Sequence, residues 1–281
     1  MGIILRRARI EDKARALEVE AKATPGLRYL NVMFEHWVHD RDGDFRVAEI
    51  DGVLMGIGKF TVMPDGSAWL EALRVSPEAQ GKGVGKQFYQ HFFAVARERQ
   101  IPQMRMYTGV RNAASKGLAE RFGFRVAATF RGASRNIEVD FMARAADTFR
   151  VIADPVCARD ILLPLNQPWA GYMVMNRTFY SITPELGLAW ASEGKIYYDD
   201  ISSSLIVLGA RFQADLALHV AGLGGNLEKC LDFAEHRARE LCVPKLSCLF
   251  PCNESQIEQA LLSRGYRLDT SDYIVMEVSV T

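Results

Sequence analysis

The sequence has no long apolar run and no signal for secretion. Its 281 residues contain no apolar stretch of about 18 residues, the length that a membrane-spanning helix requires. The first residues, from Met1 to Arg7, are typical of a strand and lack the charged-then-apolar order of a signal peptide. We therefore expect a cytoplasmic protein without a membrane partner.

Cysteine is scarce, and its distribution does not suggest a metal site or a disulfide framework. The five cysteines are odd in number, and all lie in the second half of the chain. Cys248 and Cys252 are close in sequence, but no histidine cluster accompanies them. Reduced thiols and no bound metal are the prediction.

Net charge is also missing, because 34 Lys and Arg residues balance 34 Asp and Glu residues. A nucleic-acid-binding protein usually carries an excess of positive charge, so no nucleic-acid partner is expected. Apolar residues make up 49% of the chain, which is enough to build a core. The length favours two modest domains.

One glycine-rich segment carries the strongest chemical signal. An apolar strand ends before Pro77, and apolar residues at helical spacing begin at Val84. Between the strand and the helix, glycines stand at positions 81, 83 and 85 and a lysine at position 82. A second lysine follows at position 86. Such a loop directs several backbone N–H groups and the positive end of the helix dipole at one point. A diphosphate is the predicted ligand.

Two common diphosphate loops do not fit this segment. A Walker loop would need glycine at position 80 and a hydroxyl residue at position 87, but both are glutamine. A dinucleotide-binding fingerprint would need its third glycine at position 86, where the chain has lysine.

The pattern that fits is Gln/Arg-x-x-Gly-x-Gly/Ala, which begins at Gln80 and follows a Leu-x-Val-x-Pro-Glu segment. It resembles the pyrophosphate loop of the GNAT superfamily of N-acetyltransferases, which implies acetyl-CoA as co-substrate. Asn112 and the Phe-Gly-Phe at 122–124 are similar to the family's second CoA-contacting segment. The residues implied to contact acetyl-CoA are Leu73, Arg74, Val75, Gln80, Gly81, Lys82, Gly83, Val84, Gly85, Lys86, Asn112 and Ser115.

The expected order of elements supports the same family over residues 3–144. It predicts an α/β (α+β) GNAT fold, with a mixed, mostly antiparallel twisted sheet flanked by helices. Asp51-Gly52 and Pro64-Asp65-Gly66 are strong hairpin turns. Strands are expected at 3–8, 45–50, 53–63, 68–75, 103–108, 125–130 and 136–142, and helices at 12–23, 29–39, 84–99 and 112–121, with the last two strands forming an antiparallel pair.

The second half repeats part of this order without the loop pattern. We interpret residues 1–145 as the catalytic acetyl-CoA-binding domain and residues 146–281 as a degenerate GNAT-like domain; an unrelated α+β domain is the alternative. Residues 222–226 are expected to form a plain turn. A monomer with an internal pseudo-dimer, or a homodimer, would result. Strands are expected at 205–212, 215–220 and 245–250, helices at 227–241 and 253–263, and connecting chain at 163–168.

The reaction of this family is direct attack of an amine on the thioester. An ammonium must first lose a proton, and Glu71 in the strand 68–75 is the best candidate for the base. A backbone N–H of Leu73 or Val75 would stabilise the oxyanion. Ala119 stands where many members have a tyrosine that acts as general acid, so Tyr107, or more weakly Ser115, is the candidate here. Tyr107 could equally be a packed strand aromatic, and Glu71 a solvent-facing carboxylate.

The acceptor is the least defined part. The fold implies an acceptor near Tyr29, His36 and residues 130–131, whereas Phe34 and Trp37 fit the core better. Arg131 or Arg135 could pair with a substrate carboxylate, which would favour amino acids. The leading hypothesis is therefore an N-acetyltransferase for a small amine or amino acid. The alternatives are an acyl-CoA-binding sensor or scaffold with weak or no activity, and a protein N-acetyltransferase.

Overall fold

The computed structural model describes residues 2–138 and 148–280, which form two compact units. Unit 1 comprises Met1–Met106, Ala113–Arg125 and Met276–Thr281, and unit 2 comprises Tyr107–Asn112 and Val126–Val275. The last residues of the chain thus contribute to unit 1, and residues from the first half contribute to unit 2. The domain boundary expected after residue 145 lies outside the described residues.

Unit 1 is built on a sheet with the strand order β1-β2-β3-β4-β5-β15. The strands from β1 to β4 pair antiparallel, and β4 pairs with β5 in parallel. This mixed sheet confirms the predicted fold. The elements are β1 (Ile3–Arg7), α1 (Lys13–Ala23), α2 (Leu30–His39), β2 (Asp44–Ile50), β3 (Val53–Val62), β4 (Ala68–Val75), α3 (Val84–Glu98), α4 (Ala113–Arg121) and parts of β5 (Gln103–Gly109) and β15 (Tyr273–Ser279).

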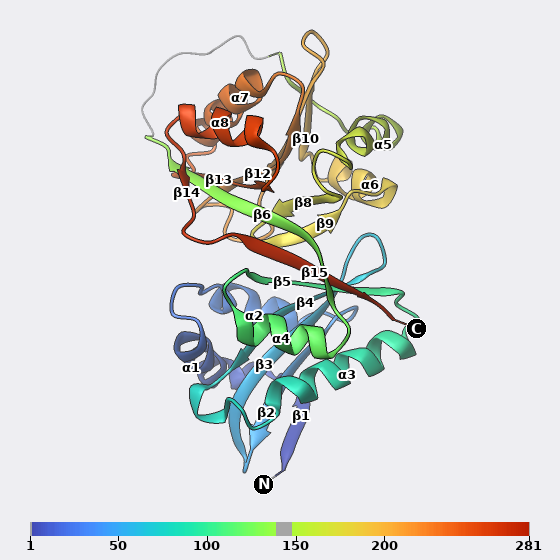
Figure 1. The fold of residues 1–281 in the computed structure, drawn as a ribbon, viewed down its shortest axis with the longest axis vertical. Coiled ribbons are helices and arrows are strands. Elements are labelled where there is room, and N and C mark those ends of the chain that lie inside the picture. The colour runs from blue at the N-terminus through green and yellow to red at the C-terminus, as the bar shows by residue number, and fades with distance from the viewer. Residues whose placement is uncertain (1, 139–147, 281) are drawn as a thin grey trace. The chain divides into compact units, whose positions relative to one another are not determined.

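Helices cover both faces of this sheet (Figure 1). On the side of α1 and α2, the ring of Phe45 makes edge contacts with Phe34 and Trp37 at centroid distances of 5.3 and 5.4 Å. On the side of α3, Phe60 packs against Phe92. Alternate residues of β2 and β3 therefore enter two separate apolar layers, as period-two alternation requires.

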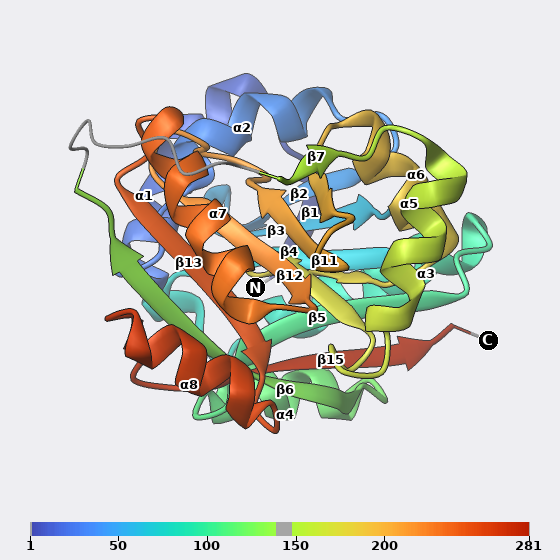
Figure 2. The ribbon, with the colours of Figure 1, turned by 90° about the horizontal axis from the view of Figure 1, so that it is seen from above.

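In unit 2 the strands follow in the order β15-β6-β13-β12-β11-β10-β7, and β8 and β9 form a separate two-stranded hairpin. Helix α7 packs on β11, β12 and β13 (Figure 2). The elements are β6 (Arg125–Asn136), β7 (Arg150–Val151), α5 (Pro155–Leu162), β8 (Tyr172–Met175), β9 (Thr178–Ser181), α6 (Pro184–Ser192), β10 (Ile196–Asp199), β11 (Ser204–Gly209), β12 (Leu218–Gly224), α7 (Leu227–Glu240), β13 (Lys245–Pro251), α8 (Ser255–Ser263) and β14 (Arg267–Leu268).

The predicted antiparallel pair at 125–130 and 136–142 is wrong. Residues 125–136 form the single strand β6, whose neighbours β13 and β15 come from the second half of the sequence. The middle of β6 stays extended because it pairs residue by residue with β13, from Asn136 opposite Lys245 to Phe130 opposite Pro251. Residues 139–142 lie outside the described residues.

The described residues offer no sign of a membrane span or a metal centre. No helix within residues 2–138 and 148–280 is long and apolar enough to cross a membrane. Nor do three or more His, Cys, Asp or Glu side chains in these ranges gather in a way that could hold a metal ion.

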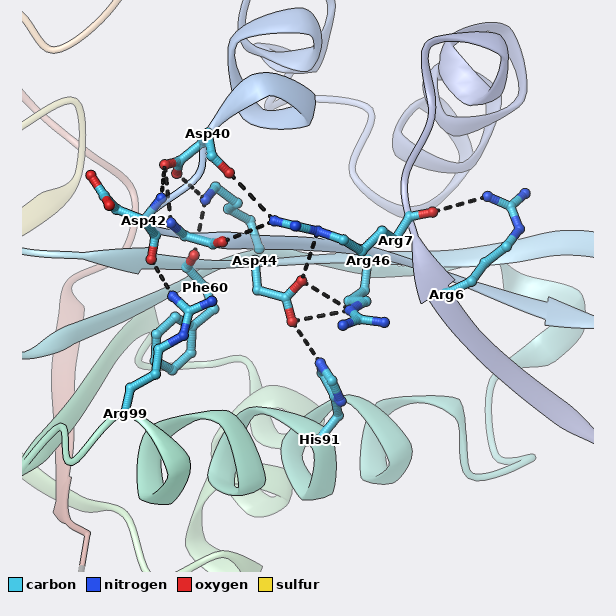
Figure 3. Close-up of polar contacts among 11 residues, drawn as sticks. Arg6, Arg7, Asp40, Asp42, Asp44, Arg46, Phe60, His91 and Arg99 are labelled. Carbon is cyan, nitrogen blue, oxygen red and sulfur yellow. Dashed lines mark hydrogen bonds and ion pairs between the residues drawn. The ribbon is translucent and has the colours of Figure 1, made fainter.

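A buried carboxylate ties α3 to the sheet of unit 1 (Figure 3). Asp44 is only 2% exposed. Arg46 Nε donates to its Oδ1 at 2.9 Å, and His91 Nε2 lies 2.6 Å from its Oδ2. Burial by itself raises the pKa of Asp44, but the hydrogen bond with His91 and the charge of Arg46 outweigh burial and hold that pKa below its usual range.

We expect Asp44→Asn to lower the free energy of unfolding by about 2 kcal/mol at pH 7, since buried charge-assisted hydrogen bonds are lost. Because the pKa of Asp44 is lower in the folded state, the ionised carboxylate stabilises the fold. This stabilisation is complete above the unfolded-state pKa of about 4, and it is lost as the pH falls through the folded-state pKa. The gap between wild type and variant should therefore close below about pH 4. Urea unfolding across pH 3–7 tests this; Asp42→Asn, an exposed neighbour, should match wild type throughout.

Candidate functional site

The glycine-rich segment forms a loop that opens directly into α3. After a short 3₁₀ turn at Pro77–Ala79, Gly81 and Gly83 adopt φ values of +77° and +90°. Side chains rarely tolerate this region, so glycine is required for the chain to turn here. Gly83 is the N-cap residue of α3, and no side chain among the described residues caps that helix. The start of α3 is therefore open to a ligand.

Five consecutive or nearly consecutive N–H groups are available in this loop. Within the described part of the chain, no backbone carbonyl accepts a hydrogen bond from them; the first helical bond is from Gln87 N to Gly83 O at 3.1 Å. N–H groups arranged in this way, together with the helix dipole, can bind an anion, and the diphosphate site stays a prediction. These N–H groups belong to Gly81, Gly83, Val84, Gly85 and Lys86.

The side chains around the loop add positive charge without blocking it. Lys82 and Lys86 are exposed. Gly85 is needed for a different reason, because a Cβ there would lie 2.8 Å from Leu118 Cδ2. The absence of a side chain lets α4 pack on the first turn of α3. The loop is thereby held from behind while its N–H groups stay accessible.

Strand β4 changes its pairing just before the loop. Its parallel register with β5 covers Ala68 to Leu70, opposite Met104 to Met106, and ends there. Ala72 has φ +53°, and the register with β3 shifts at this point, which marks a β-bulge. From Glu71 to Val75, the edge of β4 that points away from β3 is no longer paired in this register. Its backbone groups can bind a ligand, which fits the predicted role of Leu73 and Val75.

Glu71 lies at the bulge and is 7% exposed. Thr61 Oγ1 donates to its Oε1 at 2.5 Å. In the β3–β4 register Glu71 stands opposite Lys59, which is fully buried and pairs with Asp40 at the end of α2. Directly opposed residues point to the same face, so Glu71 faces the α1 and α2 side. The interpretation as a solvent-facing strand carboxylate is wrong.

The remaining predicted residues divide between the units. In unit 1, Ser115 lies half-buried on α4, and Ala119 is fully buried on the same helix. Ala119 therefore packs in the core at the position of the family tyrosine. In unit 2, Asn112 forms a turn in which its N–H donates to Gly109 O at 2.9 Å. The Tyr107 ring lies 6.1 Å from Phe179 and 6.2 Å from Tyr273, so Tyr107 is part of an aromatic cluster.

Unit 2 repeats the strand–loop–helix arrangement, but here the helix N-terminus is capped and the strand is covered. β12 pairs in parallel with β13 over Leu218 to Val220, and its register with β11 shifts at Ala221. Ala221 is the first residue after the parallel ladder, the position that Glu71 has in unit 1. The strand runs to Gly224, beyond the residue 220 at which it was predicted to end. Asn226 then caps α7, since its Oδ1 accepts from Lys229 N at 3.1 Å.

Glycines of β12 are also covered by other parts of unit 2. A Cβ on Gly222 would lie 2.9 Å from Met173 Cε, and one on Gly224 would lie 2.6 Å from Leu165 Cδ2. Trp169 Nε1 donates to Leu223 O at 2.8 Å, so this backbone carbonyl is already bonded. Residues 165–173 therefore cover β12 at the position where the edge of β4 is unpaired in unit 1. The sequence analysis did not predict this covering segment.

Two arginines that the sequence suggested as carboxylate partners already have partners in unit 2. Arg131 Nε donates to Asp272 at 3.0 Å and its Nη1 to Glu258 at 2.7 Å, and Arg135 pairs with Glu235 at 2.6 Å. Neither is an open carboxylate site, so this prediction is wrong. Of the residues considered for the acceptor in unit 1, His36 is exposed, whereas Tyr29, Phe34 and Trp37 are buried.

Comparison with known proteins adds a family and a fold. The sequence model of the acetyltransferase (GNAT) family matches residues 9–124. A GCN5-related N-acetyltransferase from Sphaerobacter thermophilus has a TM-score of 0.66 at 12% identity, over 99% of this chain and 96% of that chain. A tandem GNAT protein from the clavulanic acid biosynthesis pathway has a TM-score of 0.63 at 12% identity, over 100% and 99%. No curated protein matches the sequence.

We expect the double variant Lys82→Met/Lys86→Met to weaken coenzyme A binding about tenfold at low salt, because two charges near the diphosphate site are lost. The decline of affinity with added salt should also become shallower. Titration calorimetry at two salt concentrations measures both. Lys229→Met is the matched control, since Lys229 lies near the start of α7, where Asn226 caps the helix. An affinity loss equal in both variants would contradict the site.

We also expect one acetyl-CoA molecule to bind per chain. Of the two strand–loop–helix arrangements, the one at α3 has a glycine loop with positive φ and an uncapped helix N-terminus. In the other, the side chain of Asn226 caps α7. The stoichiometry from calorimetry or native mass spectrometry should be one. A second site would show that the segment 165–173 is displaced on binding.

Proposed function

Since this chain belongs through residues 9–124 to the acetyltransferase (GNAT) family, we propose that it is an N-acetyltransferase. It moves acetyl from acetyl-CoA to the primary amine of a small molecule or amino acid, by direct attack in a ternary complex. The observation that carries this proposal is the set of five open N–H groups at the start of α3, one loop away from the buried carboxylate of Glu71.

The loop supplies binding and orientation. The N–H groups from Gly81 to Lys86 and the end of the helix dipole bind the diphosphate of acetyl-CoA. Lys82 and Lys86 add attraction for its phosphates. With the diphosphate held at α3, the pantetheine arm extends along the unpaired edge of β4. Positioning of this kind can supply a large part of the barrier reduction in a two-substrate reaction.

Glu71 acts as general base in this proposal. A primary ammonium with a pKa of about 8 to 10 has no lone pair to attack a thioester at neutral pH. Glu71 takes its proton, directly or through one water, and the neutral nitrogen then bonds to the thioester carbon. The hydrogen bond from Thr61 Oγ1 holds the carboxylate in place.

Two further groups complete the transfer. An N–H on the open edge of β4, from Leu73 or Val75, donates to the oxyanion that forms on the carbonyl oxygen. When the tetrahedral intermediate collapses, the C–S bond breaks, the sulfur takes a proton, and the nitrogen, now bonded to the carbonyl carbon, releases its extra proton to give the neutral amide. Ala119 is a buried methyl group and has no proton to give, so water supplies this proton in the proposal.

We expect Glu71→Gln to lower kcat/KM at pH 7 by about a hundredfold, the usual size of a lost general base. The deficit should shrink as the pH rises toward the pKa of the acceptor, because the amine then loses its proton to water. Thiol release from acetyl-CoA, measured from pH 6.5 to 10 against amino acids, polyamines, aminoglycosides and peptides, gives this profile. Glu18→Gln, a surface change on α1, is the control.

Equal rates in Glu71→Gln and wild type at every pH would remove Glu71 from the mechanism. Binding of acetyl-CoA without release of thiol, over the whole panel, would support a sensor instead. The buried Ala119 is the observation that favours this second candidate. Turnover only with peptides would support a protein N-acetyltransferase.

A further inference from the structure

A buried histidine in unit 2 has no hydrogen-bond partner at one ring nitrogen. His219 lies on β12 and is 8% exposed, and within residues 2–138 and 148–280 its buried Nε2 has no hydrogen-bond partner. A buried polar atom that makes no hydrogen bond costs free energy, so such an atom in a folded protein is a candidate for ligand contact. The sequence analysis gave no role to this residue.

His219 faces the β8–β9 hairpin. In the β11–β12 register it stands opposite Gly209, and Gly222 stands opposite Val207, two residues away on β11. His219 and Gly222 therefore point to the same face. Gly222 packs against Met173 of β8. The free nitrogen thus lies on the face that the hairpin covers, and the turn of that hairpin carries an arginine.

The surroundings of His219 are positively charged. Burial first, and then the charges of Lys245 and Arg177, lower the pKa of His219 to about 4. No acidic group contributes to this shift. At neutral pH the ring is therefore neutral, and its environment favours an anion. A carboxylate placed beside His219 and Arg177 would accept hydrogen bonds from both.

Arg177 is held at the tip of the hairpin by an unusual backbone. Asn176 and Arg177 have φ values of +48° and +60°, the geometry of a two-residue turn that normally prefers Asn-Gly. Arg177 Cζ lies 4.9 Å above the ring of Tyr273, and its Nη2 lies 4.0 Å from Asp269 Oδ2. The Asp269 carboxylate already accepts a hydrogen bond from the Tyr273 hydroxyl, at an O–O distance of 2.7 Å. The guanidinium is thus held by stacking on Tyr273 and by a hydrogen bond with Tyr107, and its nearest acidic group is the Asp269 carboxylate.

Aromatic rings border the arginine. Tyr107 lies 6.1 Å from Phe179 and 6.2 Å from Tyr273, and Phe130 lies 5.0 Å from Phe179. Of these, Phe130 and Phe179 are fully buried, whereas Tyr107 and Tyr273 are half-exposed. The apolar part of a ligand bound to Arg177 could therefore pack against the rings of Tyr107 and Tyr273.

We propose that His219 and Arg177 form a carboxylate-binding site in unit 2, for a small carboxylic acid whose apolar part lies against Tyr107 and Tyr273. The site is argued from unit 2 alone and does not depend on the proposed acetyl transfer.

Direct binding tests the proposal with benzoate and acetate as probes and benzamide as the uncharged match for benzoate. NMR of the histidine ring, assigned with His219→Asn, should show shifts with both carboxylates and none with benzamide. Bound carboxylate should raise the pKa of His219 by about one to three units, so that the ring titrates above pH 5. No shift with either carboxylate would overturn the proposal.

Arg177→Gly is the decisive variant, because Asn-Gly suits this turn better than Asn-Arg. Its melting temperature should equal or exceed that of wild type, while the response of His219 to benzoate is lost. Arg150→Met, an exposed arginine of unit 2 that pairs with Asp200, should keep the response. A response that persists unchanged in Arg177→Gly would refute the site.

Discussion

The open N-terminus of α3 is the constraint on which the rest of unit 1 depends. Peptide N–H groups that donate no hydrogen bond to a carbonyl cost free energy unless water or a ligand accepts one from them. Here a glycine at φ +90° takes the N-cap place where a serine or aspartate side chain would normally bond the helix. The fold thus gives up helix stabilisation at this point and leaves N–H groups that can bind an anion. Gly85 lets α4 pack behind the loop, and the bulge of β4 opens the strand edge beside it.

Unit 2 shows what the same arrangement becomes when that constraint is relaxed. Its strand has an equivalent bulge and an equivalent parallel neighbour, but Asn226 caps the helix and Ala221 takes the place of the carboxylate. Trp169 and Leu165 occupy the strand edge. Each unit therefore satisfies its backbone groups, one through its own side chains and one through an expected ligand. The duplicated fold has diverged into a proposed catalytic unit and a unit that we propose recognises carboxylates.

Glu71 and His219 illustrate why burial matters more than residue type at such sites. Both are polar side chains on the bulged strand of their unit, and both are almost completely buried. Glu71 has one oxygen bonded by Thr61, whereas His219 retains a nitrogen without a partner. Buried polar groups of this kind cost stability unless they have a partner, so they mark the places where a fold has been adapted to bind something.

The sequence by itself determined the glycine loop, the fold of unit 1 and the candidate base, because glycine spacing, hairpin turns and apolar periodicity are local signals. Only the tertiary structure decided that β6 and β15 join strands far away in sequence, that Arg131 and Arg135 are already paired, and that Arg177 lies near His219. Strand partners and ion pairs depend on contacts between distant residues, and no local pattern encodes them. The pairing of β6 with β13 is the clearest case, since a break expected near residue 131 is held straight by a strand more than a hundred residues later.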